Sequence, residues 1–216
     1  MKSLQLKVLS VVASALAVVG VAVAPQATAA ERNLVAFGDS VLADPDAGSY
    51  LAHRYDPSKG VGVDCPTSNN YAKRAGAKLR LPVRDFSCSG AVSMSRGPQV
   101  SQQVDAAIRT GALSPATNRV VITTGFNDTY NHRDMSLPQI RKQFADRTAP
   151  QIERIKRAAP NARVQIVGYP TIGSGPYYCL FHFGPRPADS TFLPGIQDFE
   201  NKAQWMQVDL AARTGV

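Results

Sequence analysis

Residues that bind metal ions are scarce in this sequence. Its 216 residues include only three cysteines and three histidines. Neither a Cys-x-x-Cys nor a His-x-x-x-His spacing occurs among them, although such spacings are typical of zinc sites. We therefore expect neither a metal ion nor a cofactor.

Runs of lysine or arginine with interleaved aromatic residues are also missing. The chain carries a net charge of +8, but its positive residues are scattered along helix-like segments, where a solvated face explains them. A nucleic-acid site is therefore not expected. A basic protein can instead favour anionic surfaces, such as a cell envelope.

The one long apolar run lies at the N-terminus. Lys2 and Lys7 precede an uncharged apolar run over residues 8–24, and small residues at 27–29 suit cleavage. This pattern predicts a secretory signal peptide over residues 1–30, because the run is too short and wrongly flanked for a membrane anchor. The mature chain would begin near Ala30 or Glu31, without a membrane span, and would lie outside the cell or in its envelope.

Export permits disulfides, and the three cysteines are Cys65, Cys88 and Cys179. An odd number needs an explanation, and the simplest one is a single disulfide together with a buried thiol.

Strand-like and helix-like segments alternate along residues 31–216. Short apolar runs predict strands at 33–38, 83–86, 119–124 and 163–167, and helical periodicity predicts helices over 70–81, 98–111, 137–159 and 196–212. Pro150 is expected to kink or divide the third helix. Residues 42–67 and 171–195 are expected to be loops. The alternation indicates a single α/β domain with a parallel sheet covered on both faces.

Three of the predicted strands end in short polar stretches. Ser40 follows the first strand, Gly90 the second and Asn127 the third. The carboxyl ends of parallel strands share one edge of a sheet, so these residues should converge. Ser40 can then act as a nucleophile, with main-chain N–H groups of Ser40 and Gly90 and the Asn127 amide stabilising an oxyanion. The alternative is that Gly-Asp-Ser40 only forms a turn and a helix cap.

These stretches resemble the sequence blocks of the SGNH hydrolases, also called GDSL esterases and lipases. Phe37-Gly-Asp-Ser40 resembles the first block, with Val41 in place of leucine, Ser89-Gly-Ala91 the second and Gly125-Phe-Asn-Asp128 the third. The resemblance implies a flavodoxin-like three-layer α/β/α sandwich that hydrolyses carboxylic esters through an acyl-enzyme on Ser40. It is closest to secreted actinobacterial members, which carry disulfides around the site. Cys65 and Cys88, which flank the second strand, are expected to pair.

The family's fourth block, Asp-x-x-His, does not occur after Asn127. His53 and His132 lie in predicted loops. His182 is the candidate that could replace the missing catalytic histidine as the base. One explanation is that the chain is incomplete at its C-terminus, so that the catalytic histidine and a partner for Cys179 lie beyond residue 216. Another is a non-catalytic envelope or carbohydrate-binding protein that retains the fold.

Other polar and aromatic residues near these blocks have two interpretations. Asp39 and Asp128 are expected to be turn and helix-cap residues rather than acid–base groups. The aromatic residues of the long loop could line an acyl or sugar pocket, or could pack the loop onto the sheet: Tyr177, Tyr178, Phe181, Phe183 and Phe192. The substrate would be a lipid, acylated-sugar or small-molecule ester, and the protein a monomer.

Overall fold

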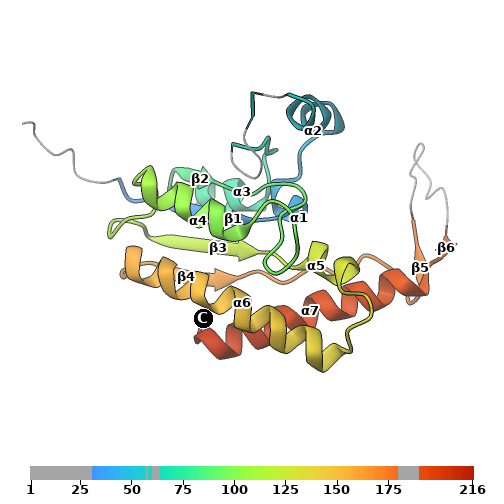
Figure 1. The fold of residues 1–216 in the computed structure, drawn as a ribbon. Coiled ribbons are helices and arrows are strands. Elements are labelled where there is room, and N and C mark those ends of the chain that lie inside the picture. The colour runs from blue at the N-terminus through green and yellow to red at the C-terminus, as the bar shows by residue number, and fades with distance from the viewer. Residues whose placement is uncertain (1–30, 57, 60–63, 180–189) are drawn as a thin grey trace, which may run out of the picture.

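The computed structural model describes residues 31–56, 58–59, 64–179 and 190–216, and Figure 1 shows how their helices and strands are arranged. The predicted signal peptide, residues 1–30, lies outside the described residues and stays a prediction.

A four-stranded parallel sheet forms the centre of the domain. Its strands are β1 (Leu34–Gly38), β2 (Val83–Asp85), β3 (Arg119–Thr123) and β4 (Arg163–Ile166), in the order β2-β1-β3-β4. All neighbouring strands are parallel, and β1 pairs with β3 over its whole length. The four strands predicted from the sequence are therefore confirmed, within a residue or two at their ends.

Helices cover both faces of this sheet, because alternate side chains of β1 point to opposite sides. Val35 and Phe37 pack with α4 (Val100–Arg109), α6 (Leu137–Ala158) and α7 (Pro194–Thr214). Leu34 and Ala36 pack with residues of α1 (Ser40–Ala43) and α3 (Tyr71–Leu79). The result is the three-layer α/β/α arrangement that the sequence predicted.

Two short helices were not predicted. Helix α2 (Ala47–Arg54) lies within residues 42–67, which were expected to be a loop, and α5 (Phe126–Asn131) follows β3. Helix α2 buries none of its residues, so it has no apolar stripe that periodicity could reveal. It begins where the Asp46 carboxylate accepts a hydrogen bond from the Ser49 N–H, 2.9 Å away.

Three further expectations need correction in the second half of the chain. Helix α6 is continuous through Pro150, so the expected division there is wrong, while a kink at this proline stays a prediction. The expected loop at 171–195 contains two short antiparallel strands, β5 (Tyr177–Tyr178) and β6 (Thr191–Phe192), which project from the body in Figure 1. Of the two accounts of Cys179, the buried thiol is wrong, because Cys179 follows this projecting strand and is exposed.

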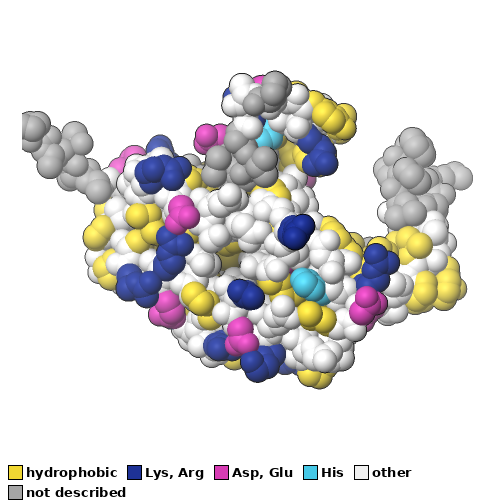
Figure 2. Space-filling model, viewed as in Figure 1, with side chains coloured by type: hydrophobic (Ala, Val, Ile, Leu, Met, Phe, Trp, Pro, Cys, Tyr) yellow, Lys and Arg dark blue, Asp and Glu magenta, His cyan; other side chains and the backbone are white. Residues whose placement is uncertain are grey.

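Charged residues are dispersed over the face seen in Figure 2, where acidic side chains lie among the Lys and Arg side chains. Several cations pair with carboxylates across helices, including Arg141 with Asp209 and Arg154 with Asp105. These pairs neutralise part of the positive charge locally.

The helices of the described ranges include none with the length and apolar character that a membrane span needs.

Candidate active site

The turn after β1 presents Ser40 at the surface. Ser40 is the first residue of α1 and is exposed. A Cβ atom at Gly38 would lie 2.3 Å from the main-chain oxygen of Thr123, so only glycine allows β1 to approach β3 this closely. The fully buried Gln103 side chain accepts a hydrogen bond from Gly38 N–H and donates one to Gly38 C=O, both at 2.9 Å. Both main-chain polar groups of Gly38, at the end of the strand that precedes Ser40, are therefore hydrogen-bonded to Gln103.

Asp39 caps α1, as expected from the sequence. Its carboxylate accepts hydrogen bonds from Val41 N–H at 3.0 Å and from the Tyr169 hydroxyl at 2.5 Å. The Tyr169 hydroxyl in turn accepts one from Phe126 N–H at 3.0 Å, which links the turns after β1 and β3. Because Asp39 is fully buried, desolvation raises the pKa of its carboxyl group to about 6, against the lowering effect of these hydrogen bonds.

The second turn carries Gly90, whose φ of +81° lies in the left-handed region. Its neighbour Ala91 accepts a hydrogen bond from the Asn127 side-chain amide at 2.8 Å. Asn127 lies in the first turn of α5, and its amide oxygen accepts a hydrogen bond from the Tyr130 hydroxyl. A carboxamide has two N–H donors, so one remains beyond the bond to Ala91.

Ser40, Gly90 and Asn127 line a single open groove with a volume of about 470 Å³. Five other residues line it, from the segments that follow β1 and β2: Asp44, Pro45, Ala47, Tyr50 and Ser89. The structure therefore brings together the three residues that the sequence placed after three different strands. Their roles as nucleophile and oxyanion donors stay predictions.

Neither described histidine lines this groove. His53 lies in α2, and His132 follows the last residue of α5. The Nε2 atoms of both are buried and have no hydrogen-bond partner within the described part of the chain. His182, the suggested substitute base, lies outside the described residues, as does Phe181.

The described aromatic residues of the 175–195 segment, Tyr177, Tyr178 and Phe192, do not line the groove. Tyr178 is buried, and its hydroxyl donates a 2.8 Å hydrogen bond to Glu200 of α7. Tyr177 is half exposed and packs against Phe192 of the opposite strand, with ring centroids 5.5 Å apart. These contacts join the segment to α7 and its two strands to each other, and a role of these residues in substrate binding stays a prediction.

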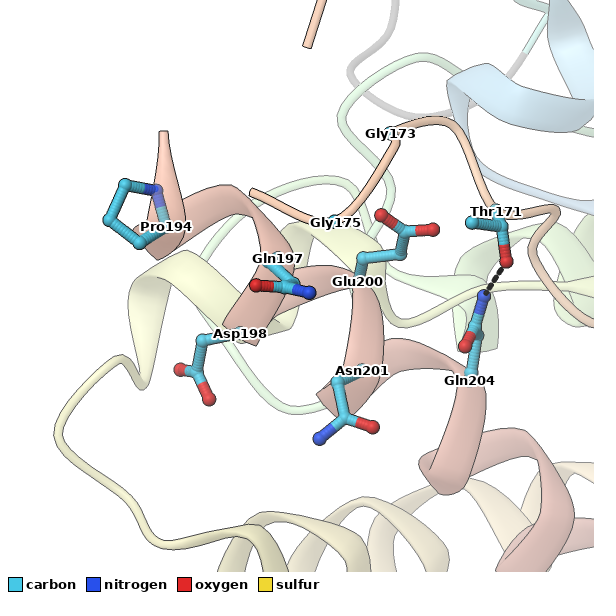
Figure 3. Close-up of a pocket in the computed structure, with 9 residues that line it drawn as sticks. All are labelled: Thr171, Gly173, Gly175, Pro194, Gln197, Asp198, Glu200, Asn201 and Gln204. Atoms are coloured by element: carbon cyan, nitrogen blue, oxygen red, sulfur yellow. Dashed lines mark hydrogen bonds between the residues drawn. The ribbon is translucent and has the colours of Figure 1, made fainter. Parts of the chain in front are cut away.

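A second hollow, of about 430 Å³, lies between residues 171–175 and the start of α7 (Figure 3). Its side chains are mainly carboxamides and carboxylates, including Gln197, Glu200 and Asn201. It shares no residue with the groove at Ser40. The Glu200 carboxylate already accepts hydrogen bonds from Ile172 N–H and the Tyr178 hydroxyl. We therefore place the candidate active site at the Ser40 groove.

Comparison with known proteins agrees with the motifs. The model of the GDSL-like Lipase/Acylhydrolase family matches residues 36–216. The chain belongs to this family. Family membership supports an ester hydrolase. No curated protein sequence matches the chain.

Two crystal structures show the same fold as this GDSL-like hydrolase. Phospholipase A1 from Streptomyces albidoflavus NA297 aligns with a TM-score of 0.52 and 22% identity, over 86% of this chain and 76% of that one. An extracellular lipase from Streptomyces rimosus aligns with a TM-score of 0.51 and 22% identity, over 85% and 76% of the two chains. At this identity the likeness concerns the fold.

Asp128 of this GDSL-like hydrolase accepts main-chain hydrogen bonds, as expected of a turn or helix-cap residue. Its buried carboxylate takes them from residues 93–95, in a distant turn. The partners lie more than 30 residues away in the chain, so no local pattern reveals them.

Among the described residues, no group of three or more His, Cys, Asp or Glu side chains is placed to hold a metal ion.

Proposed function

We propose that this GDSL-like hydrolase is an exported serine esterase that acts through an acyl-enzyme. Ser40 attacks the ester carbonyl carbon, and its hydroxyl proton passes to a base. The tetrahedral intermediate collapses with release of the alcohol, and water then hydrolyses the acyl-Ser40 ester. The observation that carries the proposal is that Ser40, Gly90 and Asn127 line one groove.

The oxyanion donors in this proposal are the main-chain N–H groups of Ser40 and Gly90 and the Asn127 amide. Donors that are fixed before reaction stabilise the developing charge most effectively, because nothing reorganises during the step. Asn127 fits this requirement, since it is buried and its carboxamide is held by Ala91 and Tyr130. Its amide donates without adding a charge to the site.

No described histidine is assigned as the base, because neither His53 nor His132 lines the groove. We keep two proposals for it. One is His182; the other is a histidine that residues 1–216 do not contain, as in the family's Asp-x-x-His block. Measurable p-nitrophenyl acetate hydrolysis by residues 31–216 that is abolished by His182→Ala would support the first, and unchanged hydrolysis would eliminate it.

A fluorophosphonate probe tests the nucleophile directly. The full-length protein should be labelled on Ser40, as shown by peptide mass spectrometry, and Ser40→Ala should abolish labelling and ester hydrolysis. Asn127→Ala should lower kcat by about 100-fold or more, because it removes one oxyanion donor. Asn161→Ala is the matched control, since Asn161 is exposed and donates its amide to Pro115 C=O instead. Wild-type protein that resists labelling at Ser40 would contradict the proposal.

The second candidate is a non-catalytic envelope or carbohydrate-binding protein that retains the fold. The observation that favours it is the lack of a described histidine in the groove. The esterase and the binding protein can be distinguished by whether the reading frame or the adjacent DNA encodes an Asp-x-x-His and a further cysteine. If neither is encoded, the binding protein is favoured. Binding of envelope polysaccharide by the Ser40→Ala protein, without any hydrolysis by wild type, would favour this candidate.

The substrate and the export of the protein belong to the same proposal. The two Streptomyces structures bear the names of a phospholipase and a lipase, so lipid esters are the first substrates to assay, followed by acetylated sugars and small acyl esters. N-terminal sequencing of the exported protein should begin near Ala30 or Glu31.

A further inference from the structure

The second and third turns of the groove are joined by an unusual set of contacts at Asp128. The Oδ2 atom of this carboxylate accepts a hydrogen bond from Ser93 N–H at 2.8 Å. The Oδ1 atom accepts three, from Met94 N–H at 3.1 Å, from Ser95 N–H at 2.9 Å and from the Ser95 hydroxyl at 2.6 Å. Asp128 is fully buried, so these four donors replace its hydration.

Asp128 follows Asn127, and the two residues hold the same segment. The Asn127 amide binds Ala91 C=O, and the Asp128 carboxylate binds the main chain of residues 93–95. Gly90 directly precedes this segment. The position of the Gly90 N–H relative to Asn127 is therefore set by contacts that residues 127 and 128 make together.

The segment has a second anchor on its other side. Cys88 N–H donates to Gly38 C=O at 2.9 Å, which ties the turn to β1, the strand that precedes Ser40. Packing around Gly90 itself does little to fix its position, because the space where its Cβ would lie has no atom within 4 Å. Gly90 thus lies between a residue that is hydrogen-bonded to β1 and a segment that is hydrogen-bonded to Asn127 and Asp128 of α5.

We propose that Asp128 is a positioning residue for the oxyanion donors: it holds residues 93–95 so that the Gly90 N–H and the Asn127 amide face the same point. The inference rests on the proposed function, because it assigns a role in stabilising that reaction's intermediate. Asp128 touches no reacting atom in this role. Its contribution should appear in kcat rather than in KM, since a displaced donor weakens the transition state and not ground-state binding.

Asp128→Asn tests this role with little change in shape. One of its two terminal atoms becomes an N–H donor, which cannot accept from the main-chain N–H groups of residues 93–95. In folded protein, verified by circular dichroism, we expect kcat for p-nitrophenyl acetate to fall about 100-fold. We expect KM to stay within about threefold. Affinity for an alkylboronic acid, which forms a tetrahedral adduct on Ser40, should weaken by a factor similar to the loss in kcat.

Asp105→Asn is the matched control, because Asp105 pairs with Arg154 between two helices and does not line the groove. Its kcat and its boronic acid affinity should equal those of wild type. Ser95→Ala removes only the hydroxyl bond to Asp128 and keeps the main-chain bonds. It should lower kcat about fivefold at unchanged KM, and it carries the test if Asp128→Asn does not fold.

A folded Asp128→Asn protein with kcat and boronic acid affinity within about twofold of wild type would overturn the role. If that variant does not fold, unchanged kcat in Ser95→Ala would overturn it. A wild-type protein without Ser40-dependent hydrolysis would overturn the proposed function itself, and this role with it.

Discussion

Asp39 lies next to the candidate nucleophile, and its burial couples the stability of the protein to pH. Desolvation raises the pKa of its carboxyl group from 3.8 to about 6, and the nearby Asp128 adds to the rise. Between these two values the folded protein binds more protons at this site than the unfolded chain. Stability from Asp39 is therefore full below about pH 4 and is lost as pH rises through about 6.

Replacing Asp39 by asparagine should remove this dependence, because a carboxamide does not ionise. The unfolding free energy of Asp39→Asn relative to wild type should rise by about 2 kcal/mol from pH 4.5 to pH 7.5. Urea denaturation of both proteins at the two pH values measures it. Asp146→Asn is the control, because hydrogen bonds from Lys142 and Arg213 lower the pKa of Asp146 and give the opposite sign. A difference that does not change with pH would show that Asp39 is not the group responsible.

For individual residues, the sequence indicated the candidate site residues but not the buried polar side chains that hold their turns in place. Ser40, Gly90 and Asn127 lie in short patterns that follow strands, so the chemistry of each could be inferred locally. Asp128 and Gln103 depend on partners 35 and 65 residues away. Both are polar side chains whose burial follows from how distant segments pack, which no local pattern states.

Among the elements, those with a buried stripe were predictable. Ile140, Phe144, Ile152 and Ile155 of α6 are all buried, as their spacing indicated. Helix α2 and the β5–β6 pair escaped prediction for a physical reason. The helix buries no residue, and each of the two strands has only two residues, so neither gives a periodic pattern.

Gln103 connects α4 to β1, and it allows a test at this scale. Gln103→Leu keeps a similar volume but leaves the Gly38 N–H without its side-chain acceptor in a buried position. We expect the free energy of unfolding to fall by about 1–3 kcal/mol, measured by urea denaturation. Gln143→Leu at a half-buried position of α6 is the control and should change it by less than about 0.5 kcal/mol. Equal effects of the two variants would mean that the contact with Gly38 adds no stability.

For the whole molecule, the α/β class and the parallel sheet followed from the alternation of segments, but the strand order did not. The order β2-β1-β3-β4 depends on which strands pair, and that choice rests on long-range packing of two apolar clusters on opposite faces. The expected pairing of Cys65 with Cys88 is confirmed. This bond joins the segment before α3 to the turn that carries Gly90, so it links one helical layer to the sheet edge that carries the candidate active site.

The disulfide should stabilise the whole domain rather than the groove alone. It joins residues 23 apart and restricts the unfolded chain. Removing it in the double variant Cys65→Ala, Cys88→Ala should lower the free energy of unfolding by about 3 kcal/mol. The hydrogen bond from Cys88 N–H to Gly38 C=O does not involve sulfur, so kcat well below the unfolding temperature should change little. Cys179→Ser is the control, because it leaves this disulfide intact. Dithiothreitol should destabilise wild type and Cys179→Ser but not the double variant; equal sensitivity of all three would contradict this role of the bond.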